Sequence, residues 1–451
     1  MGNMQKTLIL PVDIKNREMD ARLLHAAVAL DAGWRIIIGS KTLINRNLWR
    51  LPRGVYLFST FSRGRLTIAR CLRNMGFTSQ GWDEEGLIYG VRDIYLQERV
   101  SPDTMALINQ VFAWGKAHAE DLSIVAQQAG KAVEVAGNPR LDLLRPELRG
   151  LYEPEAERIR TTYGEFILVT TNLSWANPHV IPKEQKDLHE PPSPFGDNDR
   201  EGARSYLQYQ IHMLKAFRSA IPYLARALPD TRIILRPHPV ESMGSWKELL
   251  APYPNVEIIR EGAVIPWILA SRILLHSNST TGLEARLLGG CPVAFVPFIS
   301  PRHESPLPNG VSLTARTEQE LLTLISRILS GDVPDASTQD ILLRKYIHHT
   351  KELQTRYFVN RAEQLISELN FNASSFGTRL YLLIRHLVKM IRKNHSRDIH
   401  RRNVFPDIDA KEIKIRLIRI MKCINVEYRN IYIKKISDNI FEIGFRQHRE
   451  N

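Results

Sequence analysis

Short apolar runs alternate with amphipathic stretches along the first part of the chain. Thr7–Val12, Trp34–Gly39 and Val55–Ser59 are apolar runs of the length typical of buried strands. Between the first two runs, the apolar residues of Asp20–Ala32 recur with the spacing of a helix. The alternation continues to a turn at Gly137-Asn138-Pro139-Arg140. Repeated strand–helix–strand units predict an α/β fold with a parallel, doubly wound sheet.

A second alternation of the same kind begins near residue 153. Strands are predicted at Phe166–Thr171, Arg232–Arg236, Val256–Ile259, Ile273–His276 and Val293–Val296. The main helices are predicted at Tyr206–Ala227, Glu318–Leu329 and Lys351–Leu369. A polar, proline-rich stretch, 177–199, is predicted to be a loop over a site. The pattern predicts two Rossmann-like domains, at residues 1–150 and 151–372.

The remaining residues, 373–451, form a basic C-terminal extension. Apolar and basic residues recur with helical spacing over Ser375–Lys393 and again over Ala410–Ile424, which predicts two amphipathic helices. Two short strands, Tyr432–Ile436 and Ile440–Phe445, are predicted to follow as a hairpin. Residues 371–451 carry 18 Lys and Arg against 8 Asp and Glu, a surplus of 10 in a chain of net charge +13. This charge indicates a basic tail rather than a nucleic-acid-binding fold, so no nucleic-acid partner is predicted.

Several classes of protein are disfavoured by what the sequence lacks. No apolar run approaches the roughly 18–20 residues that span a bilayer, and no signal peptide is predicted. Three distant cysteines, Cys71, Cys291 and Cys423, predict neither a disulfide framework nor a zinc site, which fits the reducing cytoplasm. No phosphate loop, dinucleotide fingerprint or metal-ligand spacing occurs, so neither a cofactor nor a metal is predicted.

A histidine between two prolines follows one predicted strand of the second domain. Pro237 and Pro239 restrict the backbone on either side of His238 and hold its imidazole at the strand end. Ligands of open parallel sheets lie beyond such carboxyl ends. His238 is therefore predicted to bind a donor phosphate and to stabilise a leaving group, with Arg236 adding a charged hydrogen bond. The alternative is a loop histidine packed against the sheet.

A run of hydroxyl side chains follows another strand and opens a helix. Free N–H groups and the helix dipole favour an anion at a helix N-terminus. The sequence predicts that this run cradles a phosphate, and that Glu284 either begins the helix or accepts from a ribose diol. Simple capping of the helix is the alternative. Together with Arg236, His238 and Pro239 of the preceding motif, the residues predicted to bind nucleotide or phosphate are Ser277, Ser279, Thr280, Thr281, Gly282 and Glu284.

Three consecutive acids, Asp83, Glu84 and Glu85, end another predicted strand in the first domain and precede Gly86. Crowded carboxylates raise one another's pKa, which suits a general base near neutral pH. The alternative is a solvated acidic loop. Further polar residues at strand ends of this domain are predicted to line its acceptor side: Lys15, Arg17, Asn138 and Arg140.

The ordered acidic, His-Pro and Ser/Thr motifs resemble those of GT-B glycosyltransferases, in particular the bacterial sialyltransferase and Kdo-transferase families. The motifs are Asp83–Gly86, His238-Pro239 and Ser277–Thr281, and the chain as a whole resembles bacterial surface carbohydrate biosynthesis proteins. The resemblance implies two domains with a cleft and metal-independent transfer of a 2-keto sugar acid from a CMP-activated donor. His238 and the hydroxyls would hold the CMP phosphate, and Asp83 or Glu84 would act as general base or nucleophile.

The resemblance also implies a nascent or lipid-linked surface glycan as acceptor, in capsule, lipopolysaccharide or O-antigen biosynthesis. A basic amphipathic extension fits peripheral contact with anionic lipid at the inner face of the cytoplasmic membrane. Packing of the extension onto the core is the alternative. Three other functions stay open: a UDP-sugar enzyme similar to UDP-GlcNAc 2-epimerase, a CDP-glycerol-type polymer transferase, and a non-enzymatic scaffold for polysaccharide assembly.

Overall fold

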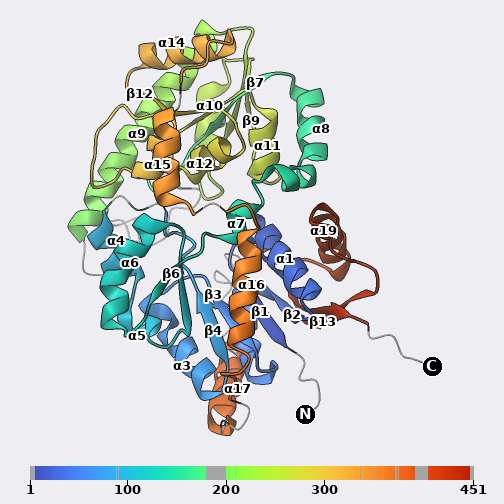
Figure 1. Cartoon of the computed structure of the whole chain (residues 1–451). Helices are drawn as coiled ribbons and strands as arrows, with labels where there is room; N and C mark the ends of the chain where they lie inside the picture. The colour runs from blue at the N-terminus through green and yellow to red at the C-terminus, as the bar shows by residue number, and fades with distance from the viewer. Residues whose placement is uncertain are drawn as a thin grey trace. The chain divides into compact units, whose positions relative to one another are not determined.

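The chain divides into two compact α/β units (Figure 1). The computed structural model describes residues 6–446 except 88, 90, 179–199, 336, 349, 371–372, 374 and 392–404. The first unit comprises Met1–Gly86, Arg99–Leu151 and Ile347–Asn451, and the second comprises Leu87–Glu98 and Tyr152–Tyr346. The proline-rich stretch predicted as a loop lies almost wholly outside the described residues.

The sheet of the first unit has eight described strands in the order β13-β14-β2-β1-β3-β4-β5-β6. The parallel strands are β1 (Thr7–Val12), β2 (Arg35–Ser40), β3 (Val55–Phe58), β4 (Thr78–Gly81), β5 (Gln110–Ala113) and β6 (Val133–Val135). Ile9 of β1 is in register with Ile37 of β2 and with Tyr56 of β3. Every residue of β1 is buried, because the strand lies inside the sheet and both faces are covered.

The helices of the first unit follow its strands in the expected alternation. Up to residue 151 the α-helices of this unit are α1, the longest, and α2, α3, α5, α6 and α7, with the short 3₁₀ helices η1, η2 and η3. Their bounds are α1 (Lys15–Asp31), α2 (Lys41–Asn47), η1 (Leu48–Arg50), η2 (Arg63–Arg65), α3 (Leu66–Asn74), α5 (Pro102–Met105), α6 (Lys116–Gln128), α7 (Pro139–Asp142) and η3 (Pro146–Leu151). Helix α4 (Arg92–Arg99) spans the boundary with the second unit.

The sheet of the second unit is parallel throughout its described strands, in the order β12-β11-β10-β7-β8-β9. The strands are β7 (Phe166–Thr170), β8 (Arg232–Arg236), β9 (Val256–Ile258), β10 (Ile273–His276), β11 (Pro292–Phe295) and β12 (Leu313–Ala315). The helices are α8 (Glu153–Tyr163), α9 (Arg200–Ala227), α10 (Gly244–Leu250), α11 (Val264–Ala270), α12 (Thr280–Leu287), α13 (Pro306–Gly310), α14 (Glu318–Leu329) and α15 (Ser337–Tyr346). Phe217 of α9 and Phe295 of β11 pack edge to face in the core of this unit.

The C-terminal part of the chain belongs to the first unit, which corrects the predicted domain boundaries. Helix α16 (Gln354–Gln364) was predicted in the second domain, yet it packs on α1. The buried carboxylate of Asp142 accepts from the backbone N–H groups of Gln354, at 3.0 Å, and Thr355, at 2.8 Å. An anion at a helix N-terminus is stabilised by these free donors, so Asp142 fixes the start of α16 on the first unit.

The basic extension is likewise integrated into the first unit. Helix α19 (Ala410–Cys423) buries Ile413 and Leu417 against α1, and helix α17 (Phe376–Ile391) packs on α2 and η1. The predicted hairpin is present as β13 (Ile431–Ser437) and β14 (Ile440–Phe445), and β14 pairs antiparallel with β2. Packing onto the core is thus the arrangement found for α19 and the hairpin.

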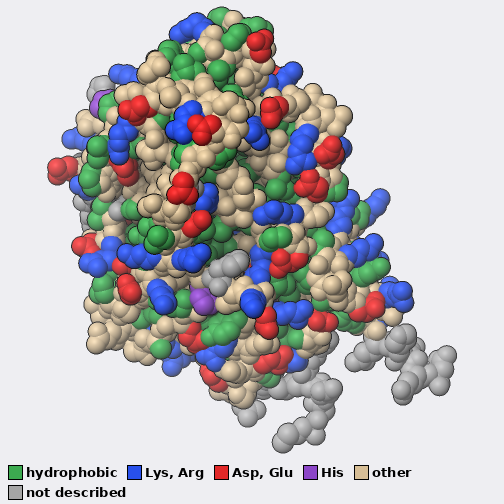
Figure 2. Space-filling view, turned by 45° about the horizontal axis from the view of Figure 1, so that its top comes forward, with side chains coloured by type: hydrophobic (Ala, Val, Ile, Leu, Met, Phe, Trp, Pro, Cys, Tyr) green, Lys and Arg blue, Asp and Glu red, His purple; other side chains and the backbone are tan. Residues whose placement is uncertain are grey.

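The charge is spread over the face shown in Figure 2, where Lys and Arg side chains lie among Asp and Glu side chains. Among the described residues, no helix is both long and apolar enough to cross a membrane.

Candidate functional site

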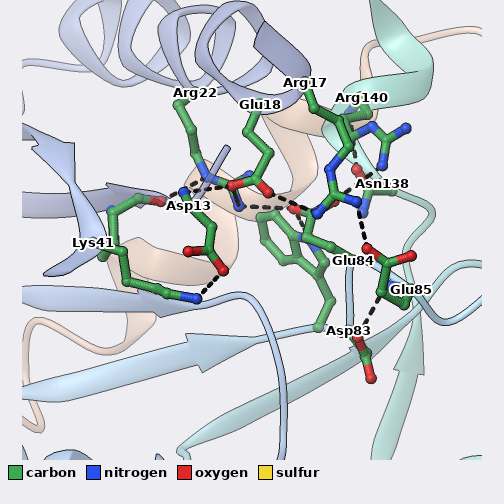
Figure 3. A network of polar contacts seen from close by, with 12 residues as sticks. Asp13, Arg17, Glu18, Arg22, Lys41, Asp83, Glu84, Glu85, Asn138 and Arg140 are labelled. Atoms are coloured by element: carbon green, nitrogen blue, oxygen red, sulfur yellow. Dashed lines mark hydrogen bonds and ion pairs between the residues drawn. The ribbon is translucent and has the colours of Figure 1, made fainter. Parts of the chain in front are cut away.

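A network of charged side chains lies at the carboxyl edge of the first sheet (Figure 3). Three of its acids follow β4, while Asp13 follows β1 and Glu18 lies on α1, which also supplies Arg17 and Arg22. The residues after β6 complete it from the other side. The members are Asp13, Arg17, Glu18, Arg22, Lys41, Asp83, Glu84, Glu85, Asn138 and Arg140. We call this set the acidic-turn network.

Each acid of the turn after β4 has an arginine of its own. The two carboxylate oxygens of Asp83 accept from Arg99, at 2.9 Å and 3.2 Å. Glu84 Oε1 accepts from Arg22 Nη2 at 2.7 Å, and Glu85 accepts from Arg17 Nη1. The predicted mutual rise in pKa is not found for Glu84 and Glu85, because each of them pairs with an arginine, whereas the charge of Glu85 does contribute to a raised pKa of Asp83, after burial.

The pKa shifts of these acids follow from burial and from the arginines. Burial disfavours the charge of Glu84, but the Arg22 and Arg140 guanidiniums outweigh burial and lower its pKa to about 2. Burial is likewise outweighed at Glu85, chiefly by Arg17, so the Glu85 pKa is also lowered. Only the pKa of Asp83 is raised, by burial in the first place, although Arg99 opposes the rise.

The three acids differ in their access to solvent. Asp83 is fully buried and Glu84 is 4% exposed, whereas the Glu85 side chain is 26% exposed and its partner Arg17 is 31% exposed. Asp83 also positions the turn, because its Oδ1 accepts from the backbone N–H of Glu85 at 3.0 Å. Glu85 is thus the acid of this turn best placed to meet a bound molecule, rather than the predicted Asp83 or Glu84.

Buried polar atoms in the network lack hydrogen-bond partners among the described residues. They include Arg22 Nη1 and Asn138 Nδ2, both on fully buried side chains. Asn138 is held in place from two directions, since its Oδ1 accepts from Arg140 N at 2.9 Å and its N–H donates to Gln354 Oε1 at 2.7 Å. Unsatisfied buried donors are costly, and oxygen-rich ligands satisfy such groups.

Gly86 and Lys15 have structural surroundings that the sequence did not indicate. A Cβ at Gly86 would lie 2.4 Å from the His118 ring, so a close helix–turn contact requires glycine there. Burial lowers the pKa of His118 to about 3, which keeps this imidazole neutral. Lys15, predicted on the acceptor side, is 7% exposed and its Nζ donates to Glu412 Oε2 at 3.2 Å on α19. Lys15 therefore anchors the C-terminal helix.

In the second unit, three neighbouring strands bring the predicted phosphate-binding residues to one sheet edge. Strands β10, β7 and β8 are adjacent, and they end at His276, Thr170 and Arg236. Thr170 Oγ1 lies 2.8 Å from Thr281 Oγ1, and Thr281 Oγ1 lies 2.8 Å from Ser279 Oγ. These contacts link the ends of β7 and β10 through a chain of hydroxyl groups.

His238 is exposed at the end of β8, and its turn is organised by a buried acid. Its Nδ1 accepts from Val240 N at 3.4 Å, which leaves the proton of the neutral ring on Nε2. Glu241 is fully buried, and its Oε1 accepts from Thr171 Oγ1 at 2.8 Å and from Leu173 N at 2.9 Å. Glu241 thereby ties the turn of His238 to the segment after β7.

Arg236 is occupied by the backbone, which corrects the prediction that it binds phosphate. Its guanidinium donates to the carbonyls of Glu261, at 2.8 Å, and Gly262, at 2.9 Å. It also lies over the Trp267 ring, 4.8 Å from the centroid. Burial lowers the Arg236 pKa to about 10. Arg236 thus holds the loop after β9 in place.

The hydroxyl-rich turn combines a helix cap with a structural asparagine. Ser279 caps α12, since its Oγ accepts from Thr281 N at 3.3 Å. Asn278 has a φ of +49°, a left-handed conformation that asparagine tolerates. Asn278 Oδ1 accepts from Ser305 N at 2.9 Å and from Asn309 Nδ2 at 2.7 Å. The predicted capping alternative therefore holds for Ser279, and Asn278 fixes the neighbouring loop.

The remaining predicted residues of this turn have different surroundings. Ser277 is buried and Thr280 is half-buried, and Pro239, predicted to bind from the His238 turn instead, is exposed. A Cβ at Gly282 would lie 2.1 Å from His276 Nε2, so glycine permits α12 to pack on that ring. Glu284 is half-buried in the second turn of α12 rather than the first.

Sequence reasoning missed the partners that position both clusters. Two of these partners, Arg22 and Glu241, are fully buried. The other two lie apart from their partners in the sequence: Arg99 is 16 residues from Asp83, and Asn309 is 31 residues from Asn278. A signal existed for Arg22, because it and His25 are the only polar residues in the apolar stretch Ala21–Leu30. None existed for Arg99, whose partner is set only by the fold.

The comparisons with known proteins give the fold. No protein-family model matches the chain, and no curated protein matches its sequence. The solved structure of the wall teichoic acid polymerase TagF is similar, with a TM-score of 0.51 and 11% identity over 81% of this chain and 90% of that chain. This likeness confirms the predicted fold class, an α/β fold of the GT-B type with two Rossmann-like units.

Two further similar structures are UDP-N-acetylglucosamine 2-epimerases. A protein from Listeria monocytogenes described as a candidate 2-epimerase has a TM-score of 0.48 and 12% identity, covering 81% of this chain and 98% of that chain. The Methanocaldococcus jannaschii enzyme in complex with UDP-GlcNAc and UDP has a TM-score of 0.47 and 12% identity, covering 80% and 100%.

Proposed function

We propose that this protein is a glycosyltransferase of the GT-B type that uses a nucleotide-activated donor. The observation that carries the proposal is the convergence of His238 and the hydroxyls of Thr281 and Thr170 at the ends of β8, β10 and β7. The carboxyl ends of adjacent parallel strands are where α/β proteins bind ligands. The N-terminus of α12 adds backbone donors suited to a phosphate.

His238 is the group of this edge that would meet the donor phosphate. With Nδ1 accepting from Val240, the neutral ring presents an Nε2–H donor. A donor aimed at a phosphate oxygen stabilises the negative charge that grows on the departing nucleotide. Glu241 positions the His238 turn and would act on the reaction only through it.

In the first unit, Glu85 would act on the acceptor. Its lowered pKa keeps it ionised at neutral pH, and its exposed fraction gives it access to a hydroxyl. An ionised carboxylate accepts a proton from an acceptor hydroxyl, or attacks the anomeric carbon in a retaining reaction. Arg17 would orient Glu85, and Arg22 and Asn138 carry the unsatisfied donors that a sugar oxygen would fill.

The finer assignment that we propose is a CMP-activated 2-keto sugar acid as donor and a nascent or lipid-linked surface glycan as acceptor, without a metal. It is supported by the ordered motifs Asp83–Gly86, His238-Pro239 and Ser277–Thr281. The competing donors are a CDP-linked group, as in the TagF structure soaked with CDPG, and a UDP-sugar, as in the epimerase complex.

A thermal-shift titration with CMP, CDP, UMP and UDP tests this proposal. A ligand that binds only the folded protein at 100 times its Kd adds about 2.7 kcal/mol of stability. We expect CMP to stabilise wild-type protein and to lose this effect in His238→Ala. Val240→Ala, an exposed change in the same turn, is the matched control and should respond as wild type.

Each outcome of the titration has a distinct meaning. A selective response to UDP or CDP would replace the CMP donor while keeping the transferase. A response to no nucleotide would overturn the transferase and favour the scaffold. An equal response in His238→Ala and wild type would refute the role of His238.

A further inference from the structure

One side of α17 is apolar and exposed along its described length. Six large apolar side chains of this helix have exposed fractions between 41% and 78%. They include two adjacent pairs and are otherwise three or four residues apart, so they form one stripe on the helix surface. We call this stripe the α17 ridge; it consists of Phe376, Leu380, Tyr381, Ile384, Leu387 and Val388.

The opposite side of α17 fixes the helix on the first unit. Leu382 is 3% exposed, and the helix packs on α2 and η1. Arg379 Nη1 donates to the carbonyl of Trp49, and Arg53 Nη2 donates to the carbonyl of Ala373 at 2.9 Å. The ridge is therefore displayed by an anchored helix, and its apolar side chains face outward from the unit.

The elements that carry the ridge are free of acidic residues. Residues 32–82, which include α2 and η1 packed on α17 and α3 across the cavity from it, hold nine Lys and Arg and no Asp or Glu. The segment 369–397, which includes α17, also holds no Asp or Glu. Several of the arginines on η1 and α3 are exposed: Arg50, Arg70 and Arg73. An apolar stripe set in a cationic surface is the pattern of helices that lie in an anionic membrane interface.

A cavity of about 350 Å³ opens between α3 and α17 beside the ridge. It is lined by Arg70 and Asn74 from α3 and by Thr378 and Tyr381 from α17. These side chains offer a guanidinium, an amide and hydroxyl groups, all of which donate hydrogen bonds to phosphate. The cavity therefore has the donors that a phosphate headgroup would use.

We propose that the α17 ridge docks on a bilayer surface that contains anionic phospholipid. The apolar side chains enter the interface, and the surrounding arginines, Arg70 among them, bind headgroup phosphates. A second copy of the chain is disfavoured as the occupant, because two such ridges in contact would juxtapose two cationic surfaces. The proposal does not depend on the identity of the donor nucleotide.

Co-sedimentation of the full chain with vesicles tests the proposal. We expect binding to vesicles of phosphatidylcholine mixed with phosphatidylglycerol, weaker binding at high salt, and little binding to phosphatidylcholine alone. Arg70→Gln and Arg73→Gln should each weaken binding about fivefold. Ile384→Asn combined with Leu387→Asn should abolish it, while far-UV circular dichroism shows that the fold is kept.

The control is Ile341→Asn, which removes a 72% exposed apolar side chain from α15 in the second unit. This variant should bind vesicles as the wild type does. Equal binding by the ridge variants, or no binding of wild type to the mixed vesicles, would overturn the proposal. A wild-type dimer in sedimentation analysis that Ile384→Asn dissociates would assign the ridge to a second copy. The vesicle assay contains no nucleotide, so its failure leaves the nucleotide titration untouched.

Discussion

Removal of the arginine that neutralises Glu84 should reveal how far the acidic-turn network depends on ion pairing. Arg22 and Glu84 are both buried, and Arg22 Nη2 lies 2.7 Å from Glu84 Oε1. Arg22→Met keeps an unbranched apolar stem of similar reach and removes the charge. Glu84 then becomes a buried carboxylate that has lost its closest counter-ion.

The expected magnitude follows from the Glu84 pKa. Against burial, Arg22, Arg140 and Arg17 together lower this pKa from 4.5 to about 2, and Arg22 has the largest share; each unit corresponds to about 1.4 kcal/mol, so the net stabilisation of the charged state is about 3 kcal/mol. This figure agrees with the roughly 3–5 kcal/mol lost when one partner of a buried pair is removed. Arg22→Met should therefore lower the free energy of unfolding of the first unit by about 3 kcal/mol at pH 7.

The pH dependence gives a second readout. In wild type the folded pKa lies below the unfolded one, so this stabilisation is fully present above about pH 4.5 and is lost as the pH falls toward about 2. In Arg22→Met, fewer arginines oppose the effect of burial, so the pKa of Glu84 rises. Protonation of Glu84 then removes the buried, unpaired charge. The difference between variant and wild type should therefore shrink as the pH is lowered from 7 to 4.

Urea denaturation followed by circular dichroism at both pH values measures these differences. Glu84→Gln added to Arg22→Met should recover part of the loss, because the buried charge is gone. Arg158→Met breaks an exposed pair with Glu155 and should change stability by less than about 1 kcal/mol. A loss in Arg22→Met no larger than that of Arg158→Met, or one that is the same at pH 7 and pH 4, would refute this account.

Three further changes test other parts of the two clusters. Gly282→Ala places a methyl group against the buried His276 ring and should cost about 1–3 kcal/mol, seen as a lower Tm; an unchanged Tm would contradict the packing role. Gly86→Ala should have a similar cost through His118, measured in the same way, and a neutral result would show that the turn can shift. Glu85→Gln should lower kcat roughly 10²–10⁴-fold with nucleotide binding kept; near-normal turnover would exclude Glu85 from the chemistry.

The strands and their order of alternation were predictable because parallel strands buried on both faces are apolar throughout. Thr7–Val12 and Ile273–His276 are such runs, and both are strands with the predicted bounds. Which of the two units the C-terminal segments pack into was not predictable in this way. Helix α16 joins the first unit through Asp142, which lies 212 residues before its hydrogen-bond partner Gln354 in the sequence.

The positions of the candidate site residues were predictable from the sequence, but their charge states and hydrogen-bond partners were not. The motifs at strand ends predicted His238 and the hydroxyl run as site residues. The sheet order places both at one edge, because β8 and β10 flank β7. The state of each acid depends on arginines from other elements, as the pairs of Asp83 with Arg99 and Glu85 with Arg17 show. Arg236 was misassigned because its carbonyl partners lie on a loop that only the fold brings near.

The pairing of β14 with β2 has a consequence for synthesis of the chain. Ile440 pairs with Gly39, so the edge of β2 gains its neighbour only after some 400 more residues have been translated. At about 5–20 residues per second, this takes roughly 20–80 s. During that time β2 presents an open sheet edge, which is a template for intermolecular pairing. The β2 edge is therefore closed only at the end of synthesis, and a nonsense mutation that removes β14 would leave this edge open permanently.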